Sequence, residues 1–332
     1  MNEMNMENVN DLTEGETATP GFVEYQGLPR WLLSVLAFPL GIGAVLAWAI
    51  SAINAGQDPK QVLVIGTVVG GLFVIFLEHI HPHTRKWLLS HGDVRADILH
   101  LFLTTILSTA ALEALLKIVL GFAAIALSQL VGDGLWPSSW PLVWQLILAL
   151  IIGDFGYYWW HRLAHETPFL WRFHATHHSV ERLYWLNAAR VHPIDNWIAF
   201  TVQTGPLLLL GAGPELIALY ALFVAVHGLF QHCNIRVKLG PLNWLFSMAE
   251  LHRWHHSKQV REEGKALGNC NYGANLIIWD VVFGTRYLPR DKIQPIEDFG
   301  IYGMNSFPKS YWRQMMSPFI WKKLKVQNNQ SS

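Results

Sequence analysis

Three closely spaced groups of histidines constrain this chain more than any other feature of its sequence. They are HRLAH (His161 and His165), HATHH (His174, His177 and His178) and HRWHH (His252, His255 and His256). Residues three and four apart lie on one face of a helix, so each group presents its imidazole rings together. The fold is therefore expected to bring segments that are far apart in the sequence to one place.

Eight clustered imidazoles predict a metal centre. A neutral imidazole is the commonest protein ligand for metals, and its second ring nitrogen is usually held by another hydrogen-bonding group. Structural zinc takes four ligands and an octahedral ion takes six. The eight rings therefore imply two metals, or one metal and a surplus of rings, and we favour two metals. Chance enrichment of histidine at a membrane interface is the alternative, which the repeated HxxHH spacing disfavours.

The order HxxxH, HxxHH, HxxHH resembles the fatty acid hydroxylase and sterol desaturase superfamily of integral-membrane, non-haem di-iron enzymes. The resemblance runs from about residue 153 to residue 285 and includes GDFGYYWWHRLAH and FHATHHS. NAARVHP, FQHCNI and WDVVFGT look like segments of bacterial and alkylglycerol-monooxygenase-like members. The resemblance implies a helical membrane fold, two Fe ions, the use of O2, and a lipid that is hydroxylated, desaturated or oxidatively cleaved.

The eight box histidines are the predicted catalytic and metal-ligating residues. The resemblance adds His227 and His232 as further candidate ligands. They are five residues apart, so they point about 140° apart on an ideal helix, and His232 is the preferred candidate. Other polar residues are predicted to support the ligating rings. They are Asp154, Asn187, His192, Asn271 and Asp280, with Glu166 and Asp195 as weaker candidates.

The apolar composition predicts a membrane protein. Of the 332 residues, 52% are hydrophobic and 14% are charged, which is too apolar for an ordinary soluble enzyme. Apolar runs predict membrane spans at 31–53, 61–77, 98–130 and 141–160. The third run is too long for a straight crossing, so we expect it to tilt or to break near Gly121. Glu113 and Lys117 within it are expected to form a structural ion pair in preference to contacting a substrate.

Between the second and third boxes, two short apolar stretches at 196–210 and 216–231 are separated by GAGPE. Each stretch is short for a full crossing, and glycine and proline predict a turn between them. We expect a re-entrant or interfacial helical hairpin, with two full crossings as the alternative. The predicted fold class is an all-α integral membrane protein with about four transmembrane helices, this hairpin and a cytoplasmic, helical, histidine-rich cap.

The sequence predicts four regions. They are a disordered acidic tail at 1–29, transmembrane helices at 30–160, a di-metal catalytic region at 161–290 that includes the hairpin 196–232, and a C-terminal interfacial segment and tail at 291–332. Basic residues set the orientation. Arg85, Lys86 and Arg95 lie in one loop, whereas the loop at 131–140 has none. Both termini and all boxes are then expected to face the cytoplasm, in a bacterial inner membrane or the endoplasmic reticulum.

The predicted function is that of a lipid oxygenase or desaturase. An aliphatic C–H bond has no useful acidity, so the chemistry needs a metal that activates O2. The sequence has no dinucleotide fingerprint, so electrons are expected from a cytochrome b5-like protein, a ferredoxin-like protein or a pterin. Zero net charge gives no reason to expect nucleic acid as a partner. The alternatives are a zinc-dependent membrane hydrolase, although HExxH is missing, and a metal transporter, although the boxes lie outside the apolar runs.

Overall fold

The structure is a computed structural model that describes residues 27–131, 135–258, 268–289, 292, 295–304 and 306–330. Within these residues, helices and loops make up the fold, with isolated bridges and no extended strand, so the all-α prediction is confirmed. The predicted acidic tail lies almost entirely outside the described residues. The α-helices are α1 (Leu28–Asn54), α2 (Pro59–Ile80), α3 (Val94–Leu99), α4 (Thr109–Val131), α5 (Leu142–Glu166), α6 (Pro168–His178), α7 (Pro193–Leu209), α8 (Pro214–His232), α9 (Ala249–His255), α10 (Ile278–Val282), α11 (Tyr311–Met316) and α12 (Trp321–Gln330).

Four shorter helical segments complete the described fold. They are the 3-10 helices η2 (Arg85–Leu88), η4 (Trp185–Ala189) and η5 (Gly240–Trp244), and the π-helix η3 (His100–Ser108). Prolines begin four of the α-helices. Pro59, Pro168, Pro193 and Pro214 each lie in a first turn, where the missing N–H is not needed and the fixed φ favours the helix.

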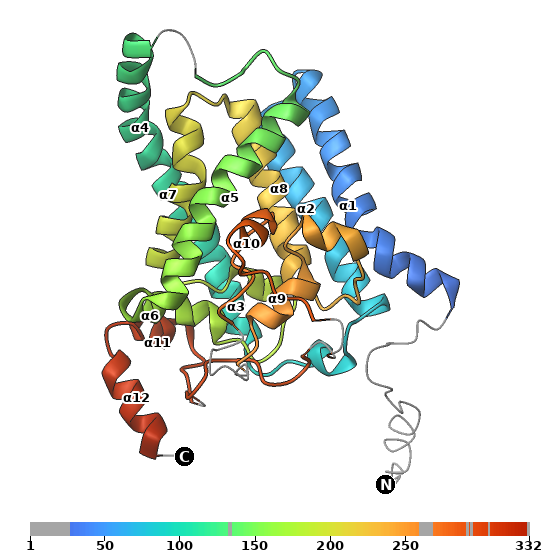
Figure 1. The fold of residues 1–332 in the computed structure, drawn as a ribbon, viewed down its shortest axis with the longest axis vertical. Coiled ribbons are helices and arrows are strands. Elements are labelled where there is room, and N and C mark those ends of the chain that lie inside the picture. The colour runs from blue at the N-terminus through green and yellow to red at the C-terminus, as the bar shows by residue number, and fades with distance from the viewer. Residues whose placement is uncertain are drawn as a thin grey trace, which may run out of the picture.

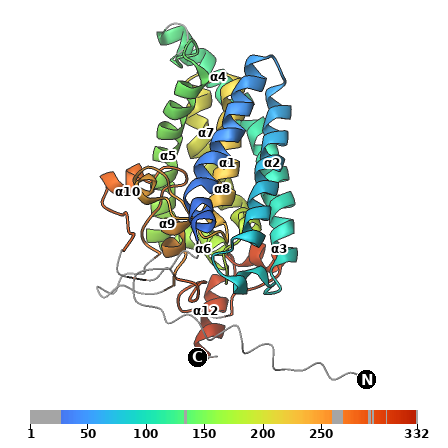
Figure 2. The ribbon, with the colours of Figure 1, turned by 90° about the vertical axis from the view of Figure 1, so that its right-hand side faces the viewer.

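Within the described residues, five helical segments are long and apolar enough to cross a membrane. They are α1, α2, Val94–Leu127, α5 and α8. Figure 1 shows them running along one another, with the α1–α2 and α7–α8 turns at one end of the bundle. Helices α6, α9 and α11 lie at the opposite end, and Figure 2 shows α9 and α10 beside the bundle there. The chain is therefore an apolar helical bundle with a cap of short helices.

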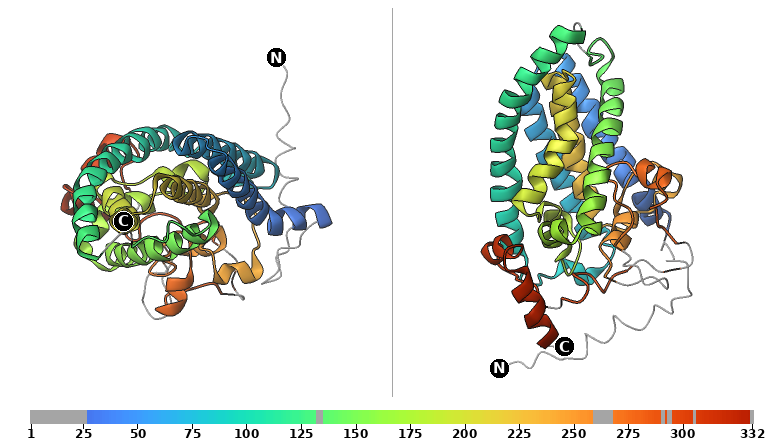
Figure 3. Two further views of the ribbon diagram at one scale, coloured as in Figure 1. Left: turned by 90° about the horizontal axis from the view of Figure 1, so that it is seen from above. Right: turned by 60° about the vertical axis from the view of Figure 1, so that its left-hand side comes forward.

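The hairpin formed by α7 and α8 lies at the centre of this bundle. Seen along the bundle in Figure 3 (left), α7 and α8 lie inside an arc of the other long helices. Helix α8 packs against α1, α2 and α5, and α7 packs against α4 and α5. Of the apolar window of α8, 56% is buried, the largest share among the five segments. A helix that is apolar on all sides is stable inside a bundle, so an interfacial position does not fit α8.

The third apolar segment continues as a helix through Gly121. Its irregular part is the π-helix η3 at the start, not the glycine. The expected break near Gly121 is therefore wrong, because a glycine does not interrupt a membrane helix whose backbone hydrogen bonds continue. The expected ion pair is present, with 2.5 Å between Lys117 Nζ and Glu113 Oε1.

Helix α5, which carries the first histidine box, approaches α7 closely at Gly156. A Cβ atom added there would lie 2.3 Å from the carbonyl oxygen of Val202. A backbone carbonyl inside a helix cannot move aside as a flexible side chain can. The short distance between α5 and α7 thus depends on the absence of a side chain at this position.

We predict that Gly156→Ala destabilises the protein by about 1–3 kcal/mol, because the two helices must separate. Gly121→Ala is the matched control, since an added Cβ meets nothing within 4 Å. The Gly121→Ala variant is expected to have a free energy of unfolding up to about 1 kcal/mol higher than wild type, because alanine has the better helix propensity. Thermal unfolding of the purified protein in detergent measures both effects. Equal unfolding temperatures for the two variants would contradict the close packing of α5 against α7.

Candidate metal centre

The three histidine boxes meet at one end of the bundle, where α5, α6, α8 and α9 come together. Their ring nitrogens form two groups, within each of which one nitrogen per residue lies within 4.8 Å of the others. The first group is His161, His165, His174, His178 and His255, and the second is His177, His232, His252 and His256. Every member is buried except His165, which is partly exposed. The fold therefore gathers nine imidazoles from four helices.

Both boxes of three histidines divide between the two groups. In HATHH, His174 and His178 belong to the first group and His177 to the second. In HRWHH, the first and last members, also four residues apart, belong to the second group, and His255 belongs to the first. Residues four apart lie almost above one another on a helix, while the third member points elsewhere. The HxxHH spacing thus places ligands in both groups from one short helix.

Hydrogen bonds fix which ring nitrogen carries the proton. His161 Nδ1 donates to the carbonyl of Tyr272 at 2.7 Å, and His174 Nδ1 donates to Asp195 Oδ2 at 3.0 Å. These oxygens only accept, so in a neutral ring Nε2 carries a lone pair. The two Nε2 atoms lie 3.0 Å apart, and when both rings are neutral neither has a proton to share. Two lone pairs at this distance repel each other unless a cation lies between them or beside them.

The same arrangement occurs between α6 and α9. His255 Nδ1 donates to the carbonyl of Cys270 at 2.7 Å, which leaves a lone pair on Nε2. This Nε2 lies 3.1 Å from Nε2 of His178. In addition, His165 Nε2 is buried without a hydrogen-bond partner. All five rings of the first group are thus close enough to serve a common ion.

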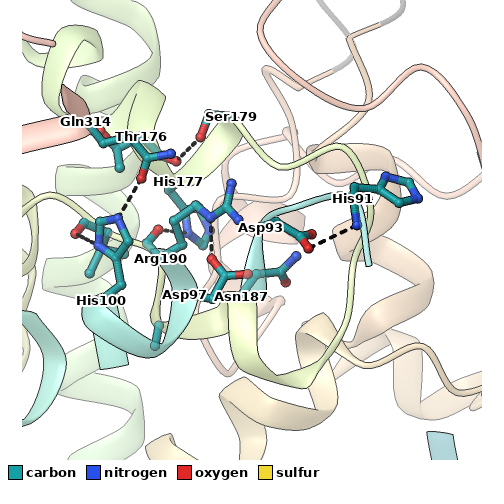
Figure 4. A network of polar contacts seen from close by, with 12 residues as sticks. His91, Asp93, Asp97, His100, Thr176, His177, Ser179, Asn187, Arg190 and Gln314 are labelled. Carbon is teal, nitrogen blue, oxygen red and sulfur yellow. Dashed lines mark hydrogen bonds and ion pairs between the residues drawn. The ribbon is translucent and has the colours of Figure 1, made fainter. Parts of the chain in front are cut away.

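The second group repeats the pattern with different acceptors. His177 Nδ1 donates to the carbonyl of Arg190 at 3.1 Å, and His232 Nδ1 donates to Asn187 Oδ1 at 3.0 Å. The Nε2 atom of His232 lies 2.8 Å from that of His252. Figure 4 shows His177 and Asn187 in this region. Each group therefore contains at least two rings that are held from outside by an oxygen atom and present an acceptor nitrogen inward.

Burial keeps five of the clustered cap histidines neutral. It lowers the pKa of His177 to about 3 and the pKa of His255 to about 3, with neighbouring imidazoles acting in the same direction. Burial also lowers the pKa values of His178, His252 and His256 well below the usual 6.5. These rings are therefore uncharged at neutral pH, which is the form that binds metals.

Asn187 is the predicted supporting residue that contacts a ligand ring directly, through His232. Asn271 and Asp280 support the centre through the backbone instead. Asp280 accepts the N–H groups of Tyr272 and Gly273, each at 2.7 Å. Asn271 adopts a φ of 53°, and its side chain bonds to neighbouring backbone groups. Together they hold the loop whose carbonyls accept from His161 and His255.

Two other predicted supporting residues contact no ligand ring. Asp154 accepts the backbone N–H groups of Asn275 and Leu276 and so fixes a loop from inside the bundle. The Nε2 atom of His192 donates to the carbonyl of Met315. Asp195, one of the two weaker candidates, bonds directly to His174. Asp195 therefore contacts a ligand ring directly, although its position in the sequence made it only a weak candidate.

His227, a predicted ligand, belongs to neither group. Its ring packs among Phe38, Phe223 and Phe246, with centroid distances of 5.6, 5.6 and 6.2 Å. Neither ring nitrogen has a hydrogen-bond partner. It is five residues before His232 on α8, and this spacing turns the two rings to different sides of the helix. The structure therefore does not bring His227 to the metal centre.

The backbone carbonyls of Arg190, Cys270 and Tyr272 are further functional groups, and sequence reasoning missed them. A carbonyl is present at every residue, so no pattern of side chains singles it out. The positive φ of Asn271 is an indirect signal, because asparagine is one of the residues that tolerates this conformation.

We predict that Asp280→Asn destabilises the protein by about 1–3 kcal/mol. Both carboxylate oxygens accept backbone N–H groups, whereas an asparagine would present an N–H donor to one of them. Glu166→Gln is the control, since Glu166 forms an exposed ion pair with Arg162, which is worth about 0–1 kcal/mol. Thermal unfolding in detergent measures both. A loss in the control as large as that in Asp280→Asn would show that the loop does not depend on Asp280.

Comparison with known proteins identifies a family and several relatives. The sequence profile described as fatty acid hydroxylase matches residues 146–285. An ornithine lipid hydroxylase of Rhizobium tropici is 37% identical over 250 residues, which cover 75% of this chain and 73% of the relative. A human alkylglycerol monooxygenase is 34% identical over 143 residues, covering 42% of this chain and 30% of the relative.

A methylsterol monooxygenase of Arabidopsis thaliana is 29% identical over 140 residues, which cover 41% of this chain and 49% of the relative. The match thus extends over most of the ornithine lipid hydroxylase but over less than half of the other two proteins. No solved structure matches the chain.

Proposed function

Because the chain belongs to the fatty acid hydroxylase family, we propose that it is a membrane-bound di-iron monooxygenase that hydroxylates a polar membrane lipid. It is an integral membrane enzyme of oxygen-dependent lipid oxidation. Desaturation and oxidative cleavage are the other outcomes that this family supports, since its members here include alkylglycerol and methylsterol monooxygenases.

The observation that carries the proposal is the set of facing Nε2 atoms in two adjacent groups. We propose that each group binds one iron, the first through five histidines and the second through four. Imidazole is a suitable ligand for iron, and both groups consist of histidine alone. The rings of His178 and His256, one from each group, stack at a centroid distance of 4.3 Å, so the two ions would be neighbours. When bound, they would supply activation of O2.

The chain's own residues hold and orient the ligands. The oxygen acceptors at Nδ1 fix the tautomers of five of the nine rings, those of His161, His174, His177, His232 and His255, and increase their basicity toward a metal. Burial excludes bulk water from both groups, which protects an oxidising centre from side reactions. Three of the ligands, His161, His165 and His232, lie at the ends of the long packed helices α5 and α8, so the rigidity of the bundle extends to the site.

The substrate proposal rests on the relative that matches over most of its length. Its name indicates that it acts on ornithine lipid, so we propose a polar, acyl-bearing lipid for this chain. Arg95 lies in α3, which Figure 1 shows at the same end of the bundle as α6 and α9, and Arg85 and Lys86 precede it in η2, which supports a cytoplasmic active site. Electrons would come from a separate donor, either a cytochrome b5-like or ferredoxin-like protein or a reduced pterin.

The direct test is comparative lipidomics of cells with the active chain and with His177→Ala. We expect a lipid with one added oxygen atom only in the presence of the active chain, together with loss of O2 consumption by the purified variant. His177 contributes to the second group and its loss removes a ligand. Turnover and metal content that are unchanged in His177→Ala would refute the di-iron assignment.

Two substitutions on the same helix separate ligand from packing residue. His232→Phe is expected to lower the iron content from about two to about one per chain, because His232 belongs to the second group. His227→Phe is expected to keep both irons, since its ring lies among aromatic side chains and its nitrogens have no partners. Metal analysis of both purified variants gives the answer. Equal loss of iron in the two would show that α8 tolerates no change, and would remove the evidence for His232 as a ligand.

A further inference from the structure

A cavity of about 340 Å³ lies beside the second histidine group. Its link to the group is Arg190, which lines the cavity and whose carbonyl accepts from His177. One wall is charged and the other is apolar. The charged wall includes His91, Asp93, Glu181, Arg190, Lys258 and Lys309. The apolar wall comes from the segment 299–308 and includes Phe299, Ile301, Met304 and Phe307.

Arg190 has donors that the protein does not use. The side chain is 4% exposed, its Nε donates to Asp97 Oδ1 at 2.5 Å, and its Nη2 is buried without a partner. Figure 4 shows the far end of the guanidinium turned away from Asp97, toward the space between Ser179 and His91. A guanidinium offers five N–H donors. A buried cationic donor without an acceptor is unfavourable, so an acceptor from outside the chain would stabilise it.

Arg182, the other buried arginine beside this cavity, has no nitrogen without an acceptor. It is 3% exposed, and its Nε and Nη2 donate to the two carboxylate oxygens of Asp93 at 2.8 and 2.9 Å. Its Nη1 donates to the carbonyl of Trp87. Each of its three nitrogens therefore has an acceptor. The unused donor belongs to the arginine that lines the cavity and contacts the histidine group.

The charges around the cavity favour an anion. The two carboxylates of its wall are already paired, Asp93 with Arg182 and Glu181 with Lys309 at 3.1 Å. An incoming anion would therefore meet lining carboxylates whose charge is already compensated, beside the free Nη2 donor of Arg190. An incoming cation would have to compete with Arg182 or Lys309 for these carboxylates.

We propose that this cavity binds the carboxylate or phosphate of the substrate's headgroup, with Arg190 as the principal donor. The proposal rests on the proposed function, because it takes the ligand to be the lipid that reaches the histidine groups. A cavity lined by both charged and apolar side chains suits a molecule that joins an acyl chain to an anion. A free carboxylate or phosphate ion has the same chemistry and is the other source of such a ligand.

The test measures binding to the purified iron-loaded chain in neutral detergent. The probes are phosphatidate, diacylglycerol with the same acyl chains, and inorganic phosphate. Wild type is expected to bind phosphatidate at least about tenfold more tightly than diacylglycerol, as for a charge-assisted hydrogen bond. Arg190→Lys is expected to lose most of this preference, because a lysine carries its three donors on one nitrogen, which cannot lie against Asp97 and also take the place of the separate Nη2. Arg182→Lys is the matched control and is expected to keep it.

A second pair of variants covers the case in which the buried arginines are needed for folding. Lys309 and Lys86 each form an exposed ion pair with a glutamate, at 3.1 and 3.0 Å. Lys309 lines the cavity and Lys86 is not among its lining residues. Lys309→Gln is expected to weaken phosphatidate binding by about two- to threefold, as for an exposed charge. Lys86→Gln is expected to have no effect.

Three results would overturn the proposal. The first is that wild type binds phosphatidate and diacylglycerol equally tightly. The second is that the two variants of a pair, Arg190→Lys and Arg182→Lys or Lys309→Gln and Lys86→Gln, lose phosphatidate binding equally. The third is that inorganic phosphate binds as tightly as phosphatidate. The last result would assign the cavity to a soluble anion. A chain that shows the headgroup preference but oxidises no lipid would instead refute the proposed function and leave this site standing.

Discussion

The hydrogen bonds at Nδ1 of the buried histidines are the interaction on which the functional part of this structure depends. An oxygen acceptor at Nδ1 places the proton on the outer side of the ring and leaves the lone pair of Nε2 pointing inward, as His161 and His174 show. Inward lone pairs only about 3 Å apart are unfavourable unless a cation is bound. Binding of the proposed metals would therefore be coupled to folding of the cap, as in other sites whose ligands converge only in the native state.

These hydrogen bonds require that several loops be held in place, and buried polar contacts do this. Asp97 pairs with Arg190, and Asp93 binds Arg182 through both carboxylate oxygens. The two pairs join the start of the third membrane segment to the chain between the second box and α7. Burial alone would raise the pKa of Asp93, but the hydrogen bonds from Arg182 outweigh it and lower this pKa. The ionised pair is thus the stable form at neutral pH, and it fixes the segment that offers the carbonyl of Arg190 to His177.

The sequence predicted the parts of the site that depend on spacing within one helix. Periodicity along HATHH indicates that His174 and His178 share a face, and both lie in the first group. It does not indicate that His255, from a distant helix, completes that group, because contacts between helices depend on packing. His227 shows the opposite limit. Its neighbourhood in the sequence suggested a ligand, whereas the aromatic rings around it decide its position.

In the fold, too, features that depend on a local stretch of sequence were predictable, and features that depend on contacts between distant helices were not. Length and apolar character predicted the membrane helices, and prolines mark where several of them begin. The central position of α8 was not predictable from its length, because a short apolar helix fits an interface and a bundle core equally well. The helices packed around α8 determine that it lies in the core of the bundle. Surrounded by other helices, α8 carries no continuous polar face that would have to remain in water.

Helix α8 links the membrane bundle to the metal centre. Its middle packs against α2, where a Cβ at Gly70 would lie 2.7 Å from Val226, and its last residue, His232, belongs to the second group. A helix held this closely along its length cannot rotate or slide without disturbing many contacts. The position of the His232 backbone is therefore set by packing inside the bundle, and Asn187 of the cap orients its ring. The apolar core thereby determines the geometry of the polar site at its end.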